Sequence, residues 1–434
     1  MRRACSMVVG IAALVLTAHD ILGADWPRWR GPNHNGISPE KSGWPRGWPP
    51  QRLWGRNVGR GCTSPIMVGG RLYVMGWTGE RRGRSQNGVD KVFCFDARTG
   101  KELWRRSYPC PYQGRVRTGD TSLYGGPSST PTFDKGTRYL YTLSIDGDLK
   151  CWDTAKRGRP VWSCNFYDKY KVPQRPDVRA GRRDYGYTSS PLVVGDLLVM
   201  EVGDNEGTLM AFNKKTGKRV WTSACKEPAG HNAGPVPIVV QRVGCVASFG
   251  IRKLLVARID KGREGKTVAL YDWVTSYANN IAAPAVIDNK VILTSGYNQH
   301  RTSLLEVSLK GVRQRWRAVD HSGASTPVIY KNRVYIADNS LVCLDLASGK
   351  RRWRGGSFRH GSCLVTAGDN KLIVFGSGRL ALVEASPGVT KYRELSRIDR
   401  IVKDTCYPHV ALSDGIICCK DLAGNLVCFS VRGK

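Results

Sequence analysis

A hairpin phrase that recurs along the chain constrains the fold more than any other feature of the sequence. In its clearest copy, an extended run ends at Asp345, the turn carries Ser348 and Gly349, and a second extended run ends at Trp353. The Asp side chain can accept hydrogen bonds from the turn backbone, and glycine takes a positive φ without a steric penalty. The phrase therefore predicts a β-hairpin whose turn sets the pairing register.

Further copies of the phrase occur before and after the middle of the chain. Asp96–Trp104 and Asn213–Trp221 keep the same spacing, Asp153–Trp162 is one residue longer, and Ser308–Trp316 keeps the spacing but moves its glycine to Gly311. A repeat of roughly 40 to 60 residues that carries four short extended runs is typical of a β-propeller. We therefore expect an all-β fold made of blades.

Eight lead-in segments of small residues, most of them ending in proline, precede apolar runs and indicate an eight-bladed propeller. In a propeller the first strand of each blade lines the central channel, where the taper leaves room for small side chains. The lead-in segments are Cys62–Pro65, Ser128–Pro131, Thr188–Pro191, Gly234–Pro237, Ala282–Pro284, Ala324–Pro327, Ser362–Cys363 and Cys406–Pro408.

Most blades are expected to carry a tryptophan on the outer strand, where it docks on the neighbouring blade. The eighth blade ends at Val431 without such a strand, whereas Arg52–Val58 has a tryptophan but no hairpin before it. The termini are therefore predicted to share the last blade and to close the ring, which leaves no sheet edge free. The expected docking residues are Trp54, Trp104, Trp162, Trp221, Trp273, Trp316 and Trp353, with Tyr392 in blade seven.

The first residues are expected to lie outside the propeller. Arg2 and Arg3 precede an apolar run from Met7 to Ala18, and Leu22–Ala24 supplies a small residue for cleavage, which is typical of a secretory signal peptide. The run is shorter than the roughly 20 residues that a spanning helix needs. The expected parts are a signal peptide (1–24), a strap without regular structure (25–51) and the propeller (52–434). We expect an exported monomer, periplasmic or extracellular, that does not span the membrane.

The 14 cysteines are expected to be mostly free, buried thiols, because several of them share one repeat position. This position precedes the hydrophobic residue that opens the hairpin phrase, and Ala211 fills it in another copy, which indicates a tight core site. Equivalent positions in different blades are too far apart to bond, since a disulfide needs Cα atoms within about 7 Å. The cysteines at this position are Cys94, Cys151, Cys343 and Cys428.

The formal charge of +32 is spread along the chain, and its densest patch runs from Lys169 to Arg183. Such a charge is consistent with a solvated basic surface or with attraction to anionic polymers. Specific nucleic-acid binding would need basic residues interleaved with aromatics in a recognisable module, and the sequence has none. We therefore expect no specific nucleic-acid partner.

Three sequence features together resemble one bacterial family. They are the Asp-x-x-Thr-Gly-Lys-x-x-Trp hairpins, the Trp-Pro-Arg-Trp-Arg-Gly-Pro opening at 26–32, and the segment 185–193. On these features the chain resembles the pyrroloquinoline-quinone (PQQ)-like β-propeller repeat proteins, which include quinoprotein alcohol dehydrogenases and the propeller lipoprotein of the outer-membrane β-barrel assembly machinery. The resemblance implies an eight-bladed fold but leaves the function open, because the repeat is a packing signature.

An enzyme of this superfamily would need PQQ between a tryptophan floor and a disulfide of adjacent cysteines, Ca²⁺ held by carboxylate and amide oxygens, and an Asp base. Cys418 and Cys419 lie where other blades have their second strand, so their side chains should point to opposite faces and not pair. The loops before the inner strands carry few acids, and no tryptophan platform is expected. Their polar residues are Asp120, Asp184, His231, Asn232, Asn279, Asn280, His321, His360 and Asp404.

The histidines in these loops are the candidate metal ligands. His231, His321 and His360 each precede an inner strand and could converge around one mouth of the channel. The sequence favours an exported, non-catalytic propeller that holds no cofactor. This propeller is expected to bind a protein or an anionic envelope polymer. The alternatives are an oxidoreductase that uses PQQ with Ca²⁺, and a metal- or sugar-binding module.

Overall fold

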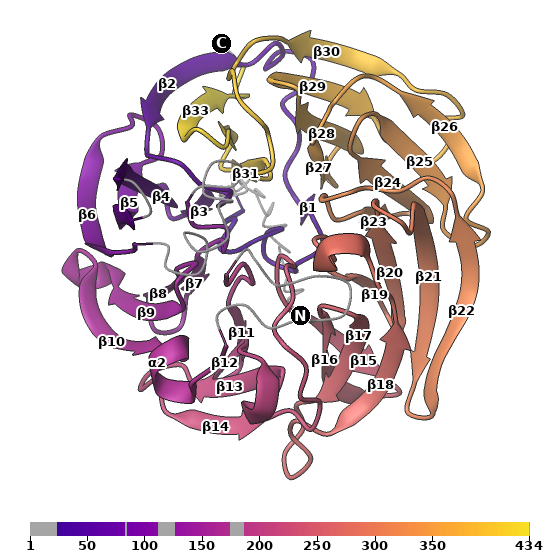
Figure 1. The fold of residues 1–434 in the computed structure, drawn as a ribbon. Coiled ribbons are helices and arrows are strands. Elements are labelled where there is room, and N and C mark those ends of the chain that lie inside the picture. Colours follow the sequence, from indigo (N-terminus) through magenta and orange to yellow (C-terminus); the bar gives the residue numbers. More distant parts are fainter. Residues whose placement is uncertain (1–23, 83–84, 112–125, 174–185, 434) are drawn as a thin grey trace, which may run out of the picture.

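The computed structural model describes residues 24–82, 85–111, 126–173 and 186–433. The expected signal peptide lies outside the described residues up to residue 23, and so do Arg175, Arg179, Arg182 and Arg183 of the basic patch. The described chain forms eight sheets, seven of four strands and one of five, arranged as blades around a central channel (Figure 1). This confirms the expected eight-bladed β-propeller.

The blades follow one another along the chain, and each begins with its innermost strand. Blade one has β3 (Ile66–Val68), β4 (Arg71–Arg82), β5 (Ser85–Asp96) and β6 (Glu102–Pro109). Blade two has β7 (Thr132–Asp134), β8 (Tyr139–Leu143), β9 (Asp148–Asp153) and β10 (Arg159–Asn165), followed by the short helix α2 (Phe166–Tyr170). Blade three has β11 (Leu192–Val194), β12 (Leu197–Glu201), β13 (Leu209–Asn213) and β14 (Arg219–Thr222). Blade four has β15 (Val236–Val240), β16 (Val243–Phe249), β17 (Lys253–Arg258) and β18 (Thr267–Asp272).

The second half of the ring repeats this order. Blade five has β19 (Ala285–Ile287), β20 (Lys290–Ser295), β21 (Arg301–Ser308) and β22 (Gly311–Ala318). Blade six has β23 (Val328–Tyr330), β24 (Arg333–Ala337), β25 (Leu341–Asp345) and β26 (Arg351–Gly355). Blade seven has β27 (Ser362–Thr366), β28 (Lys371–Gly376), β29 (Arg379–Glu384) and β30 (Glu394–Ile398). Blade eight has β31 (Ala411–Ser413), β32 (Ile416–Lys420), β33 (Asn425–Ser430) and, from the N-terminal side, β2 (Gln51–Asn57).

The repeated phrase forms the hairpin between the third and the outer strand. In blade six, Asp345 accepts hydrogen bonds from the backbone N–H (3.0 Å) and the hydroxyl (3.0 Å) of Ser348. The N–H of Gly349 donates to the Asp345 carbonyl at 2.8 Å, and Gly349 has a φ of 70°. Arg352 bonds the same carboxylate and lowers the pKa of Asp345 to about 2. The turn chemistry thus sets the register of each copy.

In four blades the hairpin glycine also makes room for the tryptophan of the preceding blade. A Cβ atom on Gly349 would lie 2.6 Å from the ring of Trp316, and one on Gly100 would lie 2.6 Å from the ring of Trp54. The same contacts join Gly158 to Trp104 and Gly217 to Trp162. The indole N–H groups then reach backbone carbonyls of the next blade, from Trp54 to Ala97 (2.9 Å), from Trp162 to Lys214 (3.1 Å) and from Trp316 to Leu346 (2.8 Å). At these four junctions, neighbouring blades are therefore joined by an aromatic ring that packs on a glycine.

Blades four and seven depart from the expected pattern. Trp273 follows β18 instead of lying in it, and Ala269 takes the position that tryptophan holds in other outer strands. The indole N–H of Trp273 donates to the Ser295 hydroxyl at 2.7 Å, so this ring anchors a connecting loop. Tyr392 likewise precedes β30 and packs edge-on against Trp353, with ring centroids 5.9 Å apart.

The ring closes as expected from the missing outer strand of blade eight. β2 pairs antiparallel with β33, and Arg52 lies opposite Phe429 and Trp54 opposite Cys428. Figure 1 shows β2 on the outside of the last blade, beside the first blade. Residues from the two ends of the chain thus complete one sheet, which leaves no outer edge for intermolecular pairing there.

The N-terminal strap crosses the channel at the end where the hairpins lie. It bonds Met67 of blade one through Trp26, reaches the Pro327 carbonyl of blade six through Arg30, and ends against Val431 of blade eight. The expectation of no regular structure was wrong at β1 (Ile37–Ser38), which pairs in parallel with β27. The strap closes this end of the channel and buries Trp26 and Trp29 inside it.

Blade eight holds a disulfide that the sequence interpretation missed. Cys418 of β32 lies opposite Cys428 of β33 with a Cα–Cα distance of 4.4 Å, and the two are bonded. The repeat positions were read correctly, but the pairing of two neighbouring strands within one blade was not considered. The free thiols predicted for Cys418 and Cys428 are therefore wrong. Cys94, Cys151, Cys343 and Cys419 are buried and form no disulfide.

Replacing a docking tryptophan should destabilise the fold strongly. Trp104 is 7% exposed and packs on Gly158, so Trp104→Ala is expected to lower the free energy of unfolding by about 3 to 5 kcal/mol. Trp44 is 40% exposed, and Trp44→Ala should change the free energy of unfolding by less than about 1 kcal/mol. Denaturant unfolding of both variants provides the measurement. Equal stability of the two variants would contradict the docking role.

Removing the disulfide should also lower stability. The bond closes a loop with a sequence separation of 10 residues, which is expected to contribute about 2 to 3 kcal/mol. Unfolding of the parent with and without reductant, and of the double variant Cys418→Ala with Cys428→Ala, measures this contribution. Reductant should have no further effect on the double variant. A parent protein that is insensitive to reductant would show that the bond is absent or adds nothing.

Candidate functional site

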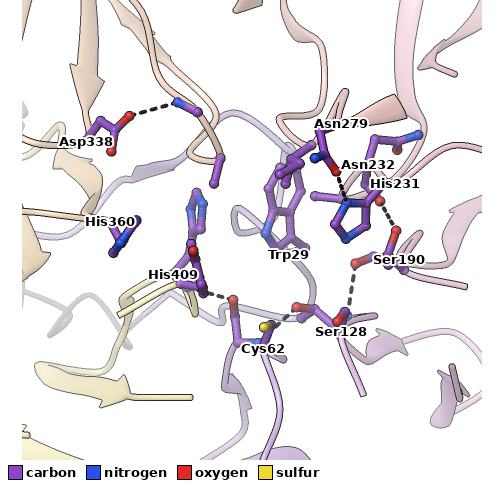
Figure 2. A pocket seen from close by; sticks show the side chains of 18 of the residues that line it. Trp29, Cys62, Ser128, Ser190, His231, Asn232, Asn279, Asp338, His360 and His409 are labelled. Atoms are coloured by element: carbon purple, nitrogen blue, oxygen red, sulfur yellow. Dashed lines mark hydrogen bonds between the residues drawn. The ribbon is translucent and has the colours of Figure 1, made fainter. Parts of the chain in front are cut away.

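The central channel contains a cavity of about 260 Å³ whose walls come mainly from the connections that precede the inner strands of all eight blades. The strap closes the hairpin end, so the cavity opens toward the lead-in end of the channel. Figure 2 shows the lining side chains arranged around Trp29, with His360 and His409 on one side and His231 and Ser190 on the other. The site is therefore a small chamber with an aromatic residue in its middle.

Trp29 of the strap supplies the aromatic surface of this chamber. It is 6% exposed and packs on Val236 and Ala283 of blades four and five. The imidazole of His409 lies with its centroid 5.3 Å from that of Trp29. The expectation of no tryptophan platform in the channel was wrong. The sequence signal was the Trp-bearing opening of the strap, but only the tertiary path of the strap brings it into the channel.

Hydroxyl groups of the lead-in segments link one blade to the next. The backbone N–H of His409 donates to the Ser64 hydroxyl at 2.8 Å. The N–H of Ser64 donates to the Thr130 hydroxyl (3.0 Å), and that of Thr130 to the Ser190 hydroxyl (3.0 Å). Each of these three hydroxyl oxygens is used as an acceptor, and each group keeps its own O–H for donation. The small residues of the lead-in segments, which fit the narrow central channel, thus also form a row of hydroxyl groups along the cavity wall.

Beside Ser190, an amide side chain orients the imidazole of His231. Its Nδ1 lies 3.1 Å from the amide oxygen of Asn279, which can only accept, so Nδ1 carries a proton. Asn232 is held by the buried carboxylate of Glu201 at 2.7 Å and by the Phe249 carbonyl at 2.8 Å. These side chains are therefore fixed before any ligand arrives.

The buried histidines near the strap are neutral. Burial, together with the neighbouring Arg30, lowers the pKa of His409 to about 3. Burial and the guanidinium groups of Arg28 and Arg30 lower the pKa of His34 to about 3 as well. The pKa of His360 is lowered mainly by burial. Uncharged imidazoles thus face the cavity and the strap at neutral pH.

The three candidate metal ligands do not come together. His231 and His360 both line the cavity, whereas His321 lies at the rim, where its Nε2 is 3.4 Å from Nδ1 of His300. His409 lines the cavity instead. The sequence interpretation missed it because the lead-in segment before it, Cys406–Pro408, matches the repeat only weakly. In the described parts of the chain, no three His, Cys, Asp or Glu side chains are grouped closely enough to hold a metal ion.

The remaining loop residues have different positions. Asn232 and Asn279 line the cavity. The amide of Asn280 is buried and donates to the carbonyls of Gly250 (3.0 Å) and Trp273 (2.9 Å). Asp404 borders a second depression, beside His360 and Cys406. Asp120 and Asp184 lie outside the described residues. Asp338, which was not anticipated, reaches the cavity and accepts the Gly323 N–H at 2.8 Å.

Among the described residues, helices are too short or too polar to cross a membrane. The fold and the channel together define the chain as an eight-bladed PQQ-like β-propeller. The chain belongs to the family whose model is described as outer membrane protein assembly factor BamB, which matches residues 88–355, more than half of the sequence. No match was found among curated proteins.

Solved structures share the fold at low sequence identity. BamB from Moraxella catarrhalis is 11% identical, with a TM-score of 0.57 over 88% of this chain and 99% of that chain. Quinohemoprotein alcohol dehydrogenase from Comamonas testosteroni is 13% identical, with a TM-score of 0.64 over 94% of this chain and 81% of that chain. An outer membrane protein assembly factor and an alcohol dehydrogenase are thus both similar in fold, so the function must be argued from the residues.

The neutral histidines make a prediction about pH. The pKa values of His34 and His409 in the folded protein are about 3, below the unfolded value of about 6.5. Below pH 6.5 the unfolded chain therefore binds more protons than the folded chain, and the free energy of unfolding decreases as the pH is lowered. We expect the free energy of unfolding to fall by about 2 to 4 kcal/mol between pH 7.5 and pH 5. Denaturant unfolding at several pH values measures this slope.

A substitution separates these histidines from other titrating groups. His34→Asn tolerates the positive φ of 56° at this position and should reduce the slope. His321→Gln, at the rim, serves as the control substitution. An unchanged slope in the His34 variant would contradict the assignment of a neutral, buried imidazole.

Proposed function

We propose that the chain is an exported, non-catalytic β-propeller that acts as a monomeric binding scaffold for a protein or an anionic envelope polymer. Membership of a family described by an outer membrane protein assembly factor supports a role in binding other proteins of the envelope. The apolar run near the N-terminus supports export to the periplasm or beyond. The formal charge of +32 favours a partner that carries negative charge.

The observation that carries this proposal is a group of exposed apolar side chains at the lead-in end of blades four and five. Tyr277 is 69% exposed and Val319 is 81% exposed, and they follow β18 and β22 respectively. The loop between β20 and β21 lies between them, because Asn298 accepts the Ser276 N–H at 2.7 Å and His300 contacts His321. We call Tyr277 and Val319, together with the β20–β21 loop between them, the rim patch.

The rim patch is held in place by the structure beneath it. Tyr277 and Ala278 both have positive φ values, 59° and 57°, which cost L-residues roughly 1 to 2 kcal/mol each. Gln299 donates to the Val274 carbonyl at 2.5 Å, and Asn280 bonds the Trp273 carbonyl, so the loop is locked from both sides. Rigid exposed tyrosines dominate many protein interfaces, because little side-chain entropy is lost on binding.

The alternative, a PQQ-dependent oxidoreductase, fits the cavity residues poorly. Trp29 would serve as a platform, but Asp338 is the one carboxylate among the described lining residues, and Ca²⁺ prefers several oxygen ligands. PQQ is an anionic quinone, yet no Arg or Lys of the described chain lines the cavity. In addition, Cys418 is bonded to Cys428 rather than to its neighbour Cys419. We therefore derive no reaction for this site.

The proposal is tested by photo-cross-linking in cells that express the chain. A benzoylphenylalanine residue in place of Tyr277 should give a discrete adduct, and the added substitution Val319→Asp should reduce its yield. The matched control is Val239, which is 58% exposed and lies beside the β15–β16 turn, at the opposite end of the channel. The same adducts from both sites, or none from site 277, would contradict the proposal.

A second measurement addresses the enzyme alternative. The absorption spectrum of PQQ with Ca²⁺ is expected to stay unchanged when purified protein is added. A shifted or intensified quinone band would instead favour the oxidoreductase.

A further inference from the structure

We propose that the channel cavity is a binding site for a neutral saccharide, with one sugar ring packed on Trp29 and its hydroxyl groups bonded to the cavity walls. This site lies inside the channel and is distinct from the rim patch. The saccharide site can therefore be tested independently of the proposed binding of a protein or polymer partner.

The size and shape of the cavity suit one sugar ring. Its volume of about 260 Å³ corresponds to about eight or nine water molecules at about 30 Å³ each. This is slightly below the range of about 300 to 1,000 Å³ that is typical of pockets for drug-sized ligands. Because the strap closes the hairpin end, a ligand enters from the lead-in end and meets Trp29. A longer saccharide would project its further residues out of the channel.

Trp29 provides the apolar surface that such a ring needs. Sugar rings have faces made of C–H groups, which pack on the π face of an indole. Trp29 is held by Val236 and Ala283 and by the ring of His409, so the indole is fixed in place. No hydrogen bond joins its indole N–H to the described residues, and Trp29 lines the cavity. The residue thus offers both a stacking surface and a donor.

The walls supply donors and acceptors in fixed positions. The hydroxyls of Ser64, Thr130 and Ser190 accept backbone hydrogen bonds, and the O–H of each has no acceptor among the described side chains and carbonyls. The amide side chains of Asn279 and Asn339 also line the cavity and carry both donors and acceptors. A polyhydroxylated ligand, whose hydroxyls both donate and accept, can use these groups without reorganising them.

The charge of the cavity selects against other ligands. The imidazoles of His360 and His409 are neutral, and Arg30 lies beside Trp29, where it bonds the Asn35 carbonyl at 3.1 Å and the Pro327 carbonyl instead of lining the cavity. An anion would meet Asp338 and no lining cation of the described chain. A purely apolar ligand would leave the wall hydroxyls buried and unpaired, at a cost of about 1 to 3 kcal/mol each. A neutral, hydroxyl-rich ligand fits best.

Saturation-transfer-difference NMR tests this site with the full mature chain. The probes are the methyl glycosides of glucose, galactose, mannose and N-acetylglucosamine, and the anionic comparators are glucuronic acid and PQQ. We expect at least one neutral glycoside to show transfer that saturates with ligand concentration. Ring C–H protons should receive more transfer than the methyl group, because they lie on the indole.

A filled cavity provides the site-specific variant. Ala324 lines the cavity, so Ala324→Phe should weaken binding about tenfold or more by occupying the ligand volume. The matched control, Ala347→Phe, places the same ring on an exposed hairpin turn and should bind as the parent does. Thermal unfolding of both variants checks that they are folded. Should Ala324→Phe fail to fold, Trp29→Phe, which keeps a smaller aromatic ring, is expected to weaken the same binding.

Three results would overturn the inference. The first is no saturable transfer to any neutral glycoside. The second is binding that Ala324→Phe, or Trp29→Phe in its place, leaves unchanged, since the ligand would then lie elsewhere. The third is saturable binding of the anionic comparators alone, which would reverse the charge argument.

Discussion

The structure depends on a contact repeated at four blade junctions, in which a tryptophan of one outer strand lies on the hairpin glycine of the next blade. The glycine is needed for two reasons, because its positive φ completes the turn and its missing Cβ admits the indole ring. Each contact packs an aromatic ring between two sheets whose strands belong to separate ladders. The contact between Trp54 and Gly100 joins the last blade to the first and closes the ring.

The strap changes what this ring can do. A plain propeller has a channel open at both ends, whereas here residues 25–50 cross one end and bond inner strands and turns of several blades. The cost is a set of buried cations and imidazoles, which stay compatible with the core because the imidazoles are neutral. The gain is a chamber with an aromatic residue inside and one opening. The strap that closes one end of the channel thus also forms part of the chamber that opens at the other end.

The chamber and the rim patch place two kinds of recognition at the same end of the molecule. The chamber offers fixed hydroxyls, a neutral imidazole and an indole, while Tyr277 and Val319 stand exposed on locked loops outside it. Both sets of residues lie on connections between blades. The blades themselves are rigid and repetitive, so that differences between propellers of one fold reside in these connections.

The sequence alone determined the repeat, the number of blades and the closure by Arg52–Val58, because turn chemistry and side-chain alternation are local and repeat along the chain. It also located His231, Asn232, Asn279 and His360 before inner strands, and all four line the cavity. Only the tertiary structure decided that Trp29 enters the channel, that His409 joins the site while His321 does not, and that Cys418 bonds Cys428. These outcomes depend on the path of an irregular strap, on loop directions and on strand register across a sheet. None of the three follows from the spacing of residues along the chain, since each joins segments whose relative placement is set by packing.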